Sequence, residues 1–517
     1  MSEKKHVLAM YDVRGIQKFI FRTSKMKDAI GASAIVENII GDALKAAVAS
    51  EQGLDCDLAW RTEQGILEYH PEEADQKDIQ VLYIGGGNAY VMYRDKELAQ
   101  EISRKMARYT MDHTYSLQLA VAISEKSDNY KDDYERLNKR MFEVKDCMVV
   151  SKPLDALPVV KIDRETGYPL IPGGTSTESG MKIREAEKVR DKNYKKRIFD
   201  NYVNQKGEDS MLAVVHIDGN NMGLRIRRLI ENRTTYADAI PEMRRISFAI
   251  DRSYKQVFLE MQNKFNPADD YADPRVMKIL TAGDDITYVC NADIALSTVE
   301  FFCRKISAYS MKTDAPNDPE YRFSVCAGIS FFHSHFPFHI AYEVAEACCD
   351  QAKDRAKEEK NKDGERIGNW VDFQFCRNVQ ASDLKKTRKV EYKTVKGENL
   401  LRRPYFIPVE EIEGNGRFKE MRREMFSLEC FREDMRNYVL NGETPRSFLK
   451  EIRNTYPLGE EQINILCAFL RSRGRKLPDE MYYTDGDHKT ARLYDILEIA
   501  DNYLEPDETD ENREVKK

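Results

Sequence analysis

Three acidic residues stand at two places where an apolar strand pattern ends. Asp284 and Asp285 lie at the tip of a hairpin pattern, Val276–Cys290, with apolar residues on both sides. Asp218 closes a separate apolar run upstream. Adjacent carboxylates repel each other, and a bound divalent cation relieves that repulsion. Asp and Gly are also ordinary turn residues, so the acidic tip on its own favours plain turn chemistry.

The order of the surrounding elements brings these acids together. Strand, helix, hairpin, helix and strand follow one another, which is the βαββαβ order of a ferredoxin-like unit. In such a unit the first and third strands are neighbours, so Asp218 falls beside Asp284 and Asp285. Three carboxylates there predict a site for two Mg²⁺ or Mn²⁺ ions, because these hard cations take oxygen ligands and bind phosphates. The alternative is a strand-to-helix turn with an Asp or Asn cap.

Small residues next to the acids are candidate nucleotide contacts. Gly219, Asn220, Asn221 and Gly223 follow Asp218 directly. Backbone N–H groups at the start of a helix bind phosphate oxygens, so this segment suits a triphosphate. A glycine before the paired acids, Gly283, lets a phosphate or base approach the hairpin backbone.

Two lysines and a histidine are weaker candidates. Lys353 and Lys357 are four residues apart in a helical pattern, so they share a face. They could contact triphosphate oxygens, although a solvated helix face is the plainer interpretation. His216 precedes Asp218 by two residues and points to the same side of the sheet. Proton transfer is one interpretation, and a packed histidine is the commoner one.

An earlier stretch repeats the same order of elements. Its first apolar run contains Asp12, and its hairpin tip carries Gly86, Gly87 and Asn88. Gly87 and Asn88 stand where the later unit has its paired acids. The tip keeps backbone freedom but has no carboxylates, so we expect one catalytic unit and one that binds nucleotide or only scaffolds.

The whole pattern predicts an α+β chain in four parts. Residues 1–150 form the first ferredoxin-like unit, and residues 151–209 form a connector with a loop and a helix. Residues 210–385 form the second, catalytic unit. Residues 386–517 form a largely helical C-terminal domain that ends in a disordered tail.

Composition excludes several classes of protein. The 517 residues are 41% hydrophobic and 33% charged, which is too apolar for a disordered chain. The net charge of −7 argues against a protein that coats nucleic acid by bulk charge. No apolar run is long enough for a transmembrane helix, so no membrane partner is expected. The ten cysteines are never spaced as CxxC, which predicts a reducing, cytoplasmic location.

Four segments resemble the polymerase-like large subunit of type III CRISPR effector complexes. They are Asp12–Phe21, His216–Gly223, Ala282–Asp285 and Cys326–Lys353, in family order. That family has two ferredoxin-like palm domains packed face to face, and the second carries a GGDD motif. The resemblance implies a nucleotidyltransferase that joins ATP into cyclic oligoadenylates with two metal ions, in antiviral defence. It also implies a C-terminal helical domain.

Three departures from the family pattern matter. Full-length members often begin with an HD nuclease domain, whereas this chain starts at the first palm, so DNA cleavage by that route is not expected. The family often has a cysteine zinc site between the palms, but Ile162–Pro172 has no cysteine, so no zinc is expected. Ala282 replaces the first glycine of GGDD.

Two alternatives stay open. Palm domains of this kind are similar to GGDEF nucleotide cyclases, so another nucleoside triphosphate, such as GTP, is a candidate substrate. The second alternative is a scaffold subunit without turnover, which binds nucleotide or a ribonucleoprotein. Candidate macromolecular partners are RNA-guided effector subunits or an activating RNA.

Overall fold

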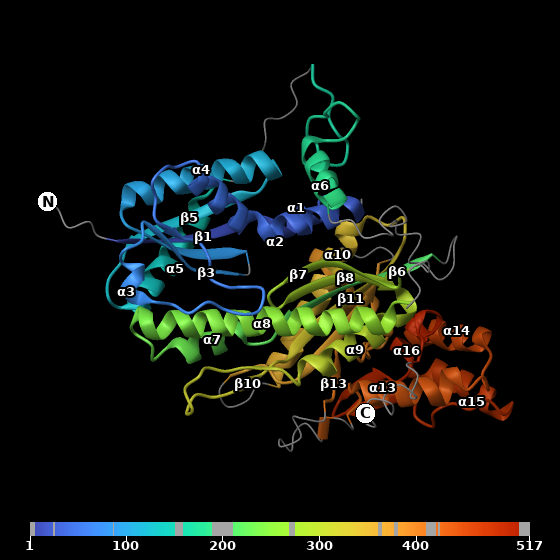
Figure 1. Ribbon diagram of the computed structural model, residues 1–517. Helices are drawn as coiled ribbons and strands as arrows, with labels where there is room; N and C mark the ends of the chain where they lie inside the picture. Colours follow the sequence, from blue (N-terminus) through green and yellow to red (C-terminus); the bar gives the residue numbers. More distant parts are fainter. Residues whose placement is uncertain are drawn as a thin grey trace.

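The computed structural model describes most of the chain. The described residues are 6–23, 26–85, 87–149, 159–188, 210–267, 274–359, 364–376, 381–409, 420–421 and 424–505. Two mixed sheets dominate these residues, and a group of helices follows the second sheet (Figure 1). The class is therefore α+β, as the sequence predicts.

The first sheet has five strands in the order β2-β3-β4-β1-β5. β1 lies between β4 and β5 and is antiparallel to both. The order β3-β4-β1-β5 agrees with the predicted βαββαβ pattern, and β2 adds a short parallel strand at the edge. The elements are β1 (Val7–Arg14), α1 (Ile16–Ile20), α2 (Met26–Ala49), β2 (Cys56–Asp57), α3 (Pro71–Ala74), β3 (Ile79–Gly85), β4 (Asn88–Tyr93), α4 (Lys96–Thr114), β5 (Gln118–Glu125) and α5 (Tyr130–Cys147).

The second sheet has six strands in the order β13-β12-β11-β6-β8-β7. Its part β11-β6-β8-β7 repeats the arrangement of the first sheet, and β12 joins parallel to β11. The elements are β6 (Met211–Gly219), α7 (Met222–Ile230), α8 (Tyr236–Phe265), β7 (Val276–Ala282), β8 (Asp285–Asn291), α9 (Ala295–Ile306), β9 (Ser310–Met311), β10 (Tyr321–Arg322), β11 (Val325–His333), α10 (Phe338–Glu358) and β12 (Asn369–Phe375).

Helices cover both faces of the second sheet. His216 and its cross-strand partner Thr287 share a face, and the ring of His216 contacts Tyr342 of α10. Tyr288 points to the opposite face, where its ring contacts Phe258 of α8. Successive side chains of a strand alternate between faces, so α10 and α8 lie on opposite sides of the sheet.

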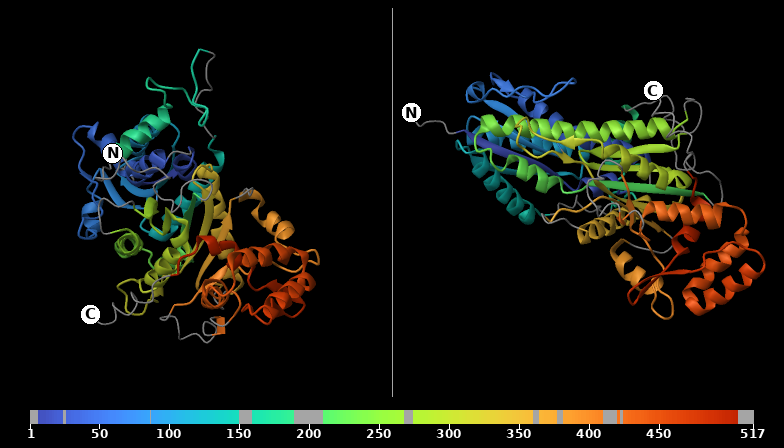
Figure 2. Two further views of the ribbon diagram at one scale, coloured as in Figure 1. Left: turned by 90° about the vertical axis from the view of Figure 1, so that its right-hand side faces the viewer. Right: turned by 90° about the horizontal axis from the view of Figure 1, so that it is seen from below.

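The long helix α8 joins the two units. It runs beneath both sheets (Figures 1 and 2). Its buried Arg244 donates hydrogen bonds to the carbonyl oxygens of Val81 and Leu82 in β3, at 2.9 and 2.8 Å. A buried guanidinium needs such acceptors, so these bonds hold α8 against the first unit.

The connector is described only in part. Its helix α6 (Thr177–Lys188) agrees with the helix predicted in the connector, and residues 189–209 lie outside the described residues. α6 packs on α2 so closely that a Cβ at Gly31 would lie 1.8 Å from the carbonyl oxygen of Lys182. The connector helix is therefore seated on the first unit.

The C-terminal part contains strands as well as helices. β13 pairs with β12 of the second sheet, and β14 and β15 form a hairpin that the sequence analysis did not predict. The predicted boundary after residue 385 falls inside α11. Of the predicted disordered tail, residues 506–517 lie outside the described residues. The elements are α11 (Leu384–Glu391), β13 (Tyr405–Ile407), α13 (Leu428–Met435), α14 (Arg446–Thr455), α15 (Glu460–Ser472), β14 (Tyr482–Asp485), β15 (His488–Ala491) and α16 (Tyr494–Ile499).

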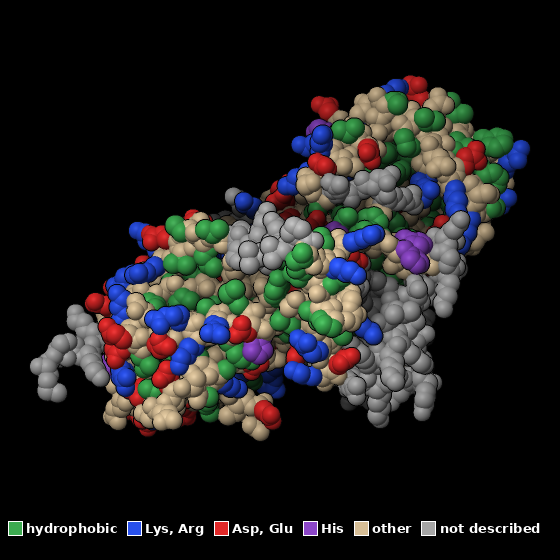
Figure 3. All heavy atoms as spheres, turned by 90° about the horizontal axis from the view of Figure 1, so that it is seen from above, with side chains coloured by type: hydrophobic (Ala, Val, Ile, Leu, Met, Phe, Trp, Pro, Cys, Tyr) green, Lys and Arg blue, Asp and Glu red, His purple; other side chains and the backbone are tan. Residues whose placement is uncertain are grey.

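The surface agrees with the charge balance. Positive and negative side chains are interspersed on the face seen from above, and its described part carries no large patch of one sign (Figure 3). Among the helices of the described segments, none is long and apolar enough to span a bilayer.

Candidate active site

The strand register brings the three predicted carboxylates to one edge of the second sheet. β6 pairs with β8 at Ile217–Ile286, so the next position along places Asp218 opposite Asp285. Asp284 lies in the turn directly before β8. Neighbouring central strands therefore gather the three side chains, as the predicted topology requires.

Close packing fixes Asp284 against β6. A Cβ at Gly219 would lie 2.7 Å from Oδ2 and 2.9 Å from Cβ of Asp284. Heavy atoms of this kind do not approach so closely, so only glycine leaves room for the carboxylate here. Gly219 was predicted as a phosphate contact, and the structure gives it this further role.

Burial and mutual repulsion perturb the two hairpin acids. Burial, followed by the charge of Asp218, raises the pKa of Asp284 to about 7. Burial and the charges of Asp218 and Asp284 raise the pKa of Asp285 to about 8. Oδ1 of Asp285 is buried and accepts no hydrogen bond within the described residues. A bound cation would stabilise the ionised form of such a carboxyl group.

Lys353 of α10 neutralises the third acid. Its Nζ forms an ion pair with Oδ2 of Asp218, and both side chains are partly buried. The predicted lysine thus reaches the carboxylate cluster, where its ammonium pairs with a candidate metal ligand. Lys357, one turn further along α10, is exposed.

The donor set fits a hard divalent metal, although the ligands are not assembled around one point. In the described part of the chain, no three His, Cys, Asp or Glu side chains are already placed as ligands of one ion. Three carboxylates in mutual electrostatic contact, one with an unpartnered oxygen, are nevertheless the donors that Mg²⁺ and Mn²⁺ prefer. Binding would require Lys353 to release Asp218.

His216 is a packed side chain beside the cluster. Its Nδ1 lies 3.2 Å from Oγ1 of Thr287 and 3.4 Å from Oδ1 of Asp285. Burial lowers its pKa to about 4, so the ring is neutral near pH 7. The packed interpretation therefore describes its surroundings best.

Two predicted nucleotide contacts use their side chains elsewhere. Asn220 donates to the carbonyl oxygen of Gly368 at 3.1 Å. Asn221 exchanges two hydrogen bonds with the backbone of Arg366, each 3.0 Å long. These amides hold the segment before β12, and the backbone N–H of Asn220 donates to the carbonyl oxygen of Ser324 at 2.8 Å. The backbone N–H groups after Asn220, at the start of α7, are therefore the candidates for contacting phosphate. Gly223, in the first turn of α7, has open space around its Cβ position.

The first unit repeats the pairing of a strand carboxylate with a lysine, but not the two hairpin acids. Asp12 pairs in register with Asn88, and its Oδ2 accepts an ion pair from Nζ of Lys145 at 2.6 Å. Lys145 lies on α5, the helix after the closing strand, as Lys353 does in the second unit. Lys145 was not among the predicted site residues, although an alignment of the two units places it opposite Lys353. Gly87 has φ 79°, and the predicted contact Gly86 lies outside the described residues.

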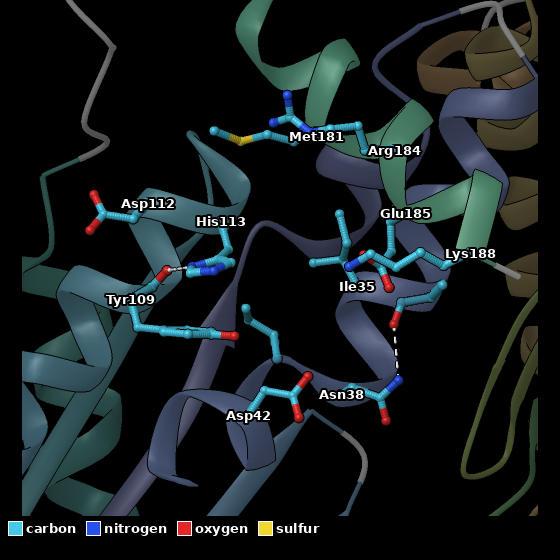
Figure 4. A pocket seen from close by; sticks show the side chains of 12 residues that line it. Ile35, Asn38, Asp42, Tyr109, Asp112, His113, Met181, Arg184, Glu185 and Lys188 are labelled. Carbon is cyan, nitrogen blue, oxygen red and sulfur yellow. Dashed lines mark hydrogen bonds and ion pairs between the residues drawn. The ribbon is translucent and has the colours of Figure 1, made fainter. Parts of the chain in front are cut away.

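A separate pocket lies between α2 and α4 of the first unit and α6 of the connector (Figure 4). Its volume is about 410 Å³, and none of the predicted site residues lines it. Tyr109 and His113 stack on one wall, with ring centroids 3.7 Å apart. Charges of both signs surround it, including Asp42, Arg184 and Lys188, so its lining selects no single ligand charge.

Comparisons with known proteins agree with this fold. Residues 211–364 match the family model described as Cas10/Cmr2, second palm domain. The Csm1 structure from T. onnurineus superposes with a TM-score of 0.55 at 14% identity, covering 96% of this chain and 69% of that one. A Csm1-Csm4 subcomplex of the type III-A CRISPR-Csm interference complex gives 0.55 at 16% identity, covering 96% and 69%.

A Csm1-Csm4 cassette in complex with pppApA also gives a TM-score of 0.55, at 15% identity, covering 98% of this chain and 70% of that one. No curated protein matches the chain in sequence. Identities this low show the fold alone. Residues 211–364 thus resemble the second palm domain of Cas10/Cmr2 proteins, and the chain shares the fold of Csm1 over nearly its whole length.

Substituting Gly219 by alanine is expected to weaken metal binding while the fold is retained. The added Cβ displaces Asp284 from its position beside β6. Moving one ligand in this way should lower Mn²⁺ affinity about tenfold, measured by electron paramagnetic resonance. Gly223→Ala is the matched control, because nothing lies within 4 Å of its Cβ position. Equal affinities in the two variants would contradict this role of Gly219.

Proposed function

We propose that the chain is a nucleotidyltransferase that joins ATP into cyclic oligoadenylate-type second messengers in CRISPR-type defence. The observation that carries the proposal is the cluster of Asp218, Asp284 and Asp285, with Lys353, in a Cas10/Cmr2-type palm domain. Structures of the Csm1-Csm4 cassette with one ATP, with pppApA and with cA4 support ATP as the first substrate to test.

The three carboxylates would hold two Mg²⁺ or Mn²⁺ ions. Such ions would supply a lowered pKa for an attacking ribose hydroxyl and would stabilise charge on the phosphate oxygens. Lys353 would exchange Asp218 for triphosphate oxygens when substrate binds, and Lys357 would add a second positive charge. Backbone N–H groups from Asn221 to Gly223, at the start of α7, would orient the triphosphate, with Gly283 leaving room at the hairpin.

The first unit would hold the acceptor nucleotide. Gly87 and Asn88 form its hairpin tip, and Lys145 lies beside Asp12 where the second unit has Lys353 beside Asp218. The hairpin tip near Lys145 has no counterpart of Asp284 and Asp285, so Lys145 suits the binding of phosphate without a metal ion. The reaction forms a bond from the ribose oxygen to the α-phosphorus and releases pyrophosphate. A subunit partner or an activating RNA would control it.

Mass spectrometry of the reaction products tests the proposal. Purified protein is incubated with each nucleoside triphosphate and Mg²⁺ or Mn²⁺, with and without RNA. A cyclic product from ATP supports the proposal, whereas a product only from GTP would favour the GGDEF-like alternative. Absence of product together with absence of metal-dependent ATP binding would favour a scaffold.

Metal affinity is expected to rise with pH. Without metal, the pKa values of Asp284 and Asp285 are raised to about 7 and about 8. Below these values a metal must displace protons, so Mn²⁺ affinity should fall about tenfold per pH unit for each proton displaced. Titrations at about pH 6, 7.5 and 9 check this. An affinity independent of pH would show that the carboxyls are not the ligands.

The same pKa shifts predict how metal-free stability depends on pH. The folded chain binds more protons than the unfolded chain between about pH 4 and about pH 8. The buried His216 acts in the opposite direction below about pH 6.5, because its pKa is lowered to about 4, but it offsets only one of the two carboxyl protons. The free energy of unfolding should therefore fall as pH rises through that window. Saturating Mn²⁺ should reverse the trend, because the ions favour the ionised carboxylates.

A further inference from the structure

A short helix of the first unit contacts the catalytic side of the second. Phe21, at the end of α1, stacks on Tyr342 of α10, with ring centroids 3.6 Å apart and an angle of 17° between planes. One turn earlier, Nε2 of Gln17 donates to Oε1 of Glu346 at 2.8 Å. These contacts join the two units on the face of the second sheet that carries His216.

The stacked rings lead to a candidate metal ligand. Tyr342 meets His216 edge-on, with centroids 5.8 Å apart and an angle of 83°. Nδ1 of His216 lies 3.4 Å from Oδ1 of Asp285. Tyr342 is 2% exposed, and its hydroxyl has no hydrogen-bond partner among the described residues. Ring packing, and not a hydrogen bond, therefore holds Tyr342 in place.

The connector fixes α1 from the other side. A five-residue helix cannot hold its own position, because isolated helices of that length are unstable. Nζ of the buried Lys182 on α6 donates to the carbonyl oxygen of Phe19 and pairs with Glu178 at 2.6 Å. Glu178 also pairs with Arg22 at 3.2 Å. α1 is thus held between α6 and α10.

We infer that Phe21 is a positioning residue for the Asp285 carboxylate, acting through the rings of Tyr342 and His216. The first unit then does more than hold a nucleotide, since it also sets the geometry of the second unit's ligands. Loss of the Phe21 ring would free Tyr342 to tilt and let His216 and Asp285 move. This inference rests on the proposed function only in assigning Asp285 the role of a metal ligand.

Four variants test the inference. Phe21→Leu and Tyr342→Leu keep an apolar side chain and remove a ring. Tyr342→Phe keeps the ring and removes only a hydroxyl that makes no hydrogen bond among the described residues. Arg61→Ala is the matched control, because Arg61 pairs with Asp251 of α8 at 3.1 Å and so joins the same two units elsewhere.

Two readouts separate the possibilities. Both leucine variants should lower kcat about tenfold or more with KM nearly unchanged, because a misplaced ligand slows chemistry more than binding. They should also shift the ring resonance of His216 in an NMR spectrum of histidine-labelled protein. Tyr342→Phe and Arg61→Ala should match the wild type in both readouts.

Unshifted His216 signals in Phe21→Leu would overturn the inference. So would a loss of kcat in Tyr342→Phe equal to that in Tyr342→Leu, because the hydroxyl would then be the acting group. The NMR readout needs no turnover. A wild type without product would therefore count against the proposed function, while the His216 shift still decides the inference.

Discussion

Replacing Asp284 and Asp285 together by asparagine is expected to abolish product formation, with a fall in rate of roughly a thousandfold or more. Asparagine keeps the size of each side chain but removes the negative charge that a metal requires. The raised pKa values of both acids show that the metal-free fold resists their ionisation. The double variant should therefore be at least as stable as the wild type at pH 8, so lost activity would not reflect lost fold.

The control for this variant removes a nearby charge that is outside the cluster. Asp350 lies on α10, 3.7 Å from Nζ of Lys353, and 64% of its side chain is exposed. Asp350→Asn should retain product formation within about threefold, because an exposed charge is screened by solvent. Products are compared by mass spectrometry and melting temperatures by calorimetry. Undiminished synthesis by Asp284→Asn/Asp285→Asn would contradict the proposed function.

The carboxylate cluster was predictable because it depends on local order alone. An acid at the end of the first strand and acids at the tip of the next hairpin must meet once the first and third strands pair. The pairing of Ile217 with Ile286 confirms that neighbouring arrangement. The position of Lys353 followed from helical spacing, but its pairing with Asp218 did not, because spacing fixes a face and not a partner.

Contacts between distant segments left no local signal. Asn220 and Asn221 follow a strand and precede a helix, which favours phosphate binding, yet their amides hold Gly368 and Arg366. Tyr342 and its stacking on Phe21 depend on how two units pack, which no periodicity reports. Such contacts need the three-dimensional arrangement.

Strand β12 shows that alternating polar residues can conceal the burial of both faces of a strand. Asp372 and Gln374 alternate with aromatic residues, a pattern typical of a strand with one exposed face, yet both are fully buried. Arg388 pairs with Asp372 at 2.6 Å, and Arg403 donates to Gln374 at 3.3 Å. These later arginines satisfy the polar groups and let β12 extend the sheet. By contrast, the Gly486-Asp487 turn of the missed hairpin was a usable signal.

Substituting Gly328 by alanine is expected to destabilise the fold by about 3 kcal/mol or more. Gly328 lies in β11, paired with His216 on one side and Asp372 on the other. A Cβ there would lie 1.9 Å from the carbonyl oxygen of Ala345 and 2.3 Å from the amide nitrogen of Cys349, both in the backbone of α10. Backbone cannot rotate away as a side chain can, so the whole helix must shift.

That shift would act on function as well as stability, because α10 carries both Tyr342 and Lys353. Urea unfolding measures the stability, and Gly41→Ala in α2 is the control. Its Cβ position has nothing within 4 Å, so alanine there should stabilise the helix by up to about 1 kcal/mol. Activity of Gly328→Ala at a temperature where it stays folded should fall, since the shift of α10 would displace Lys353 from its place beside the carboxylate cluster. An unchanged unfolding midpoint for Gly328→Ala would show that α10 is not seated directly on β11, and the positions of Lys353 and Tyr342 would lose their structural basis.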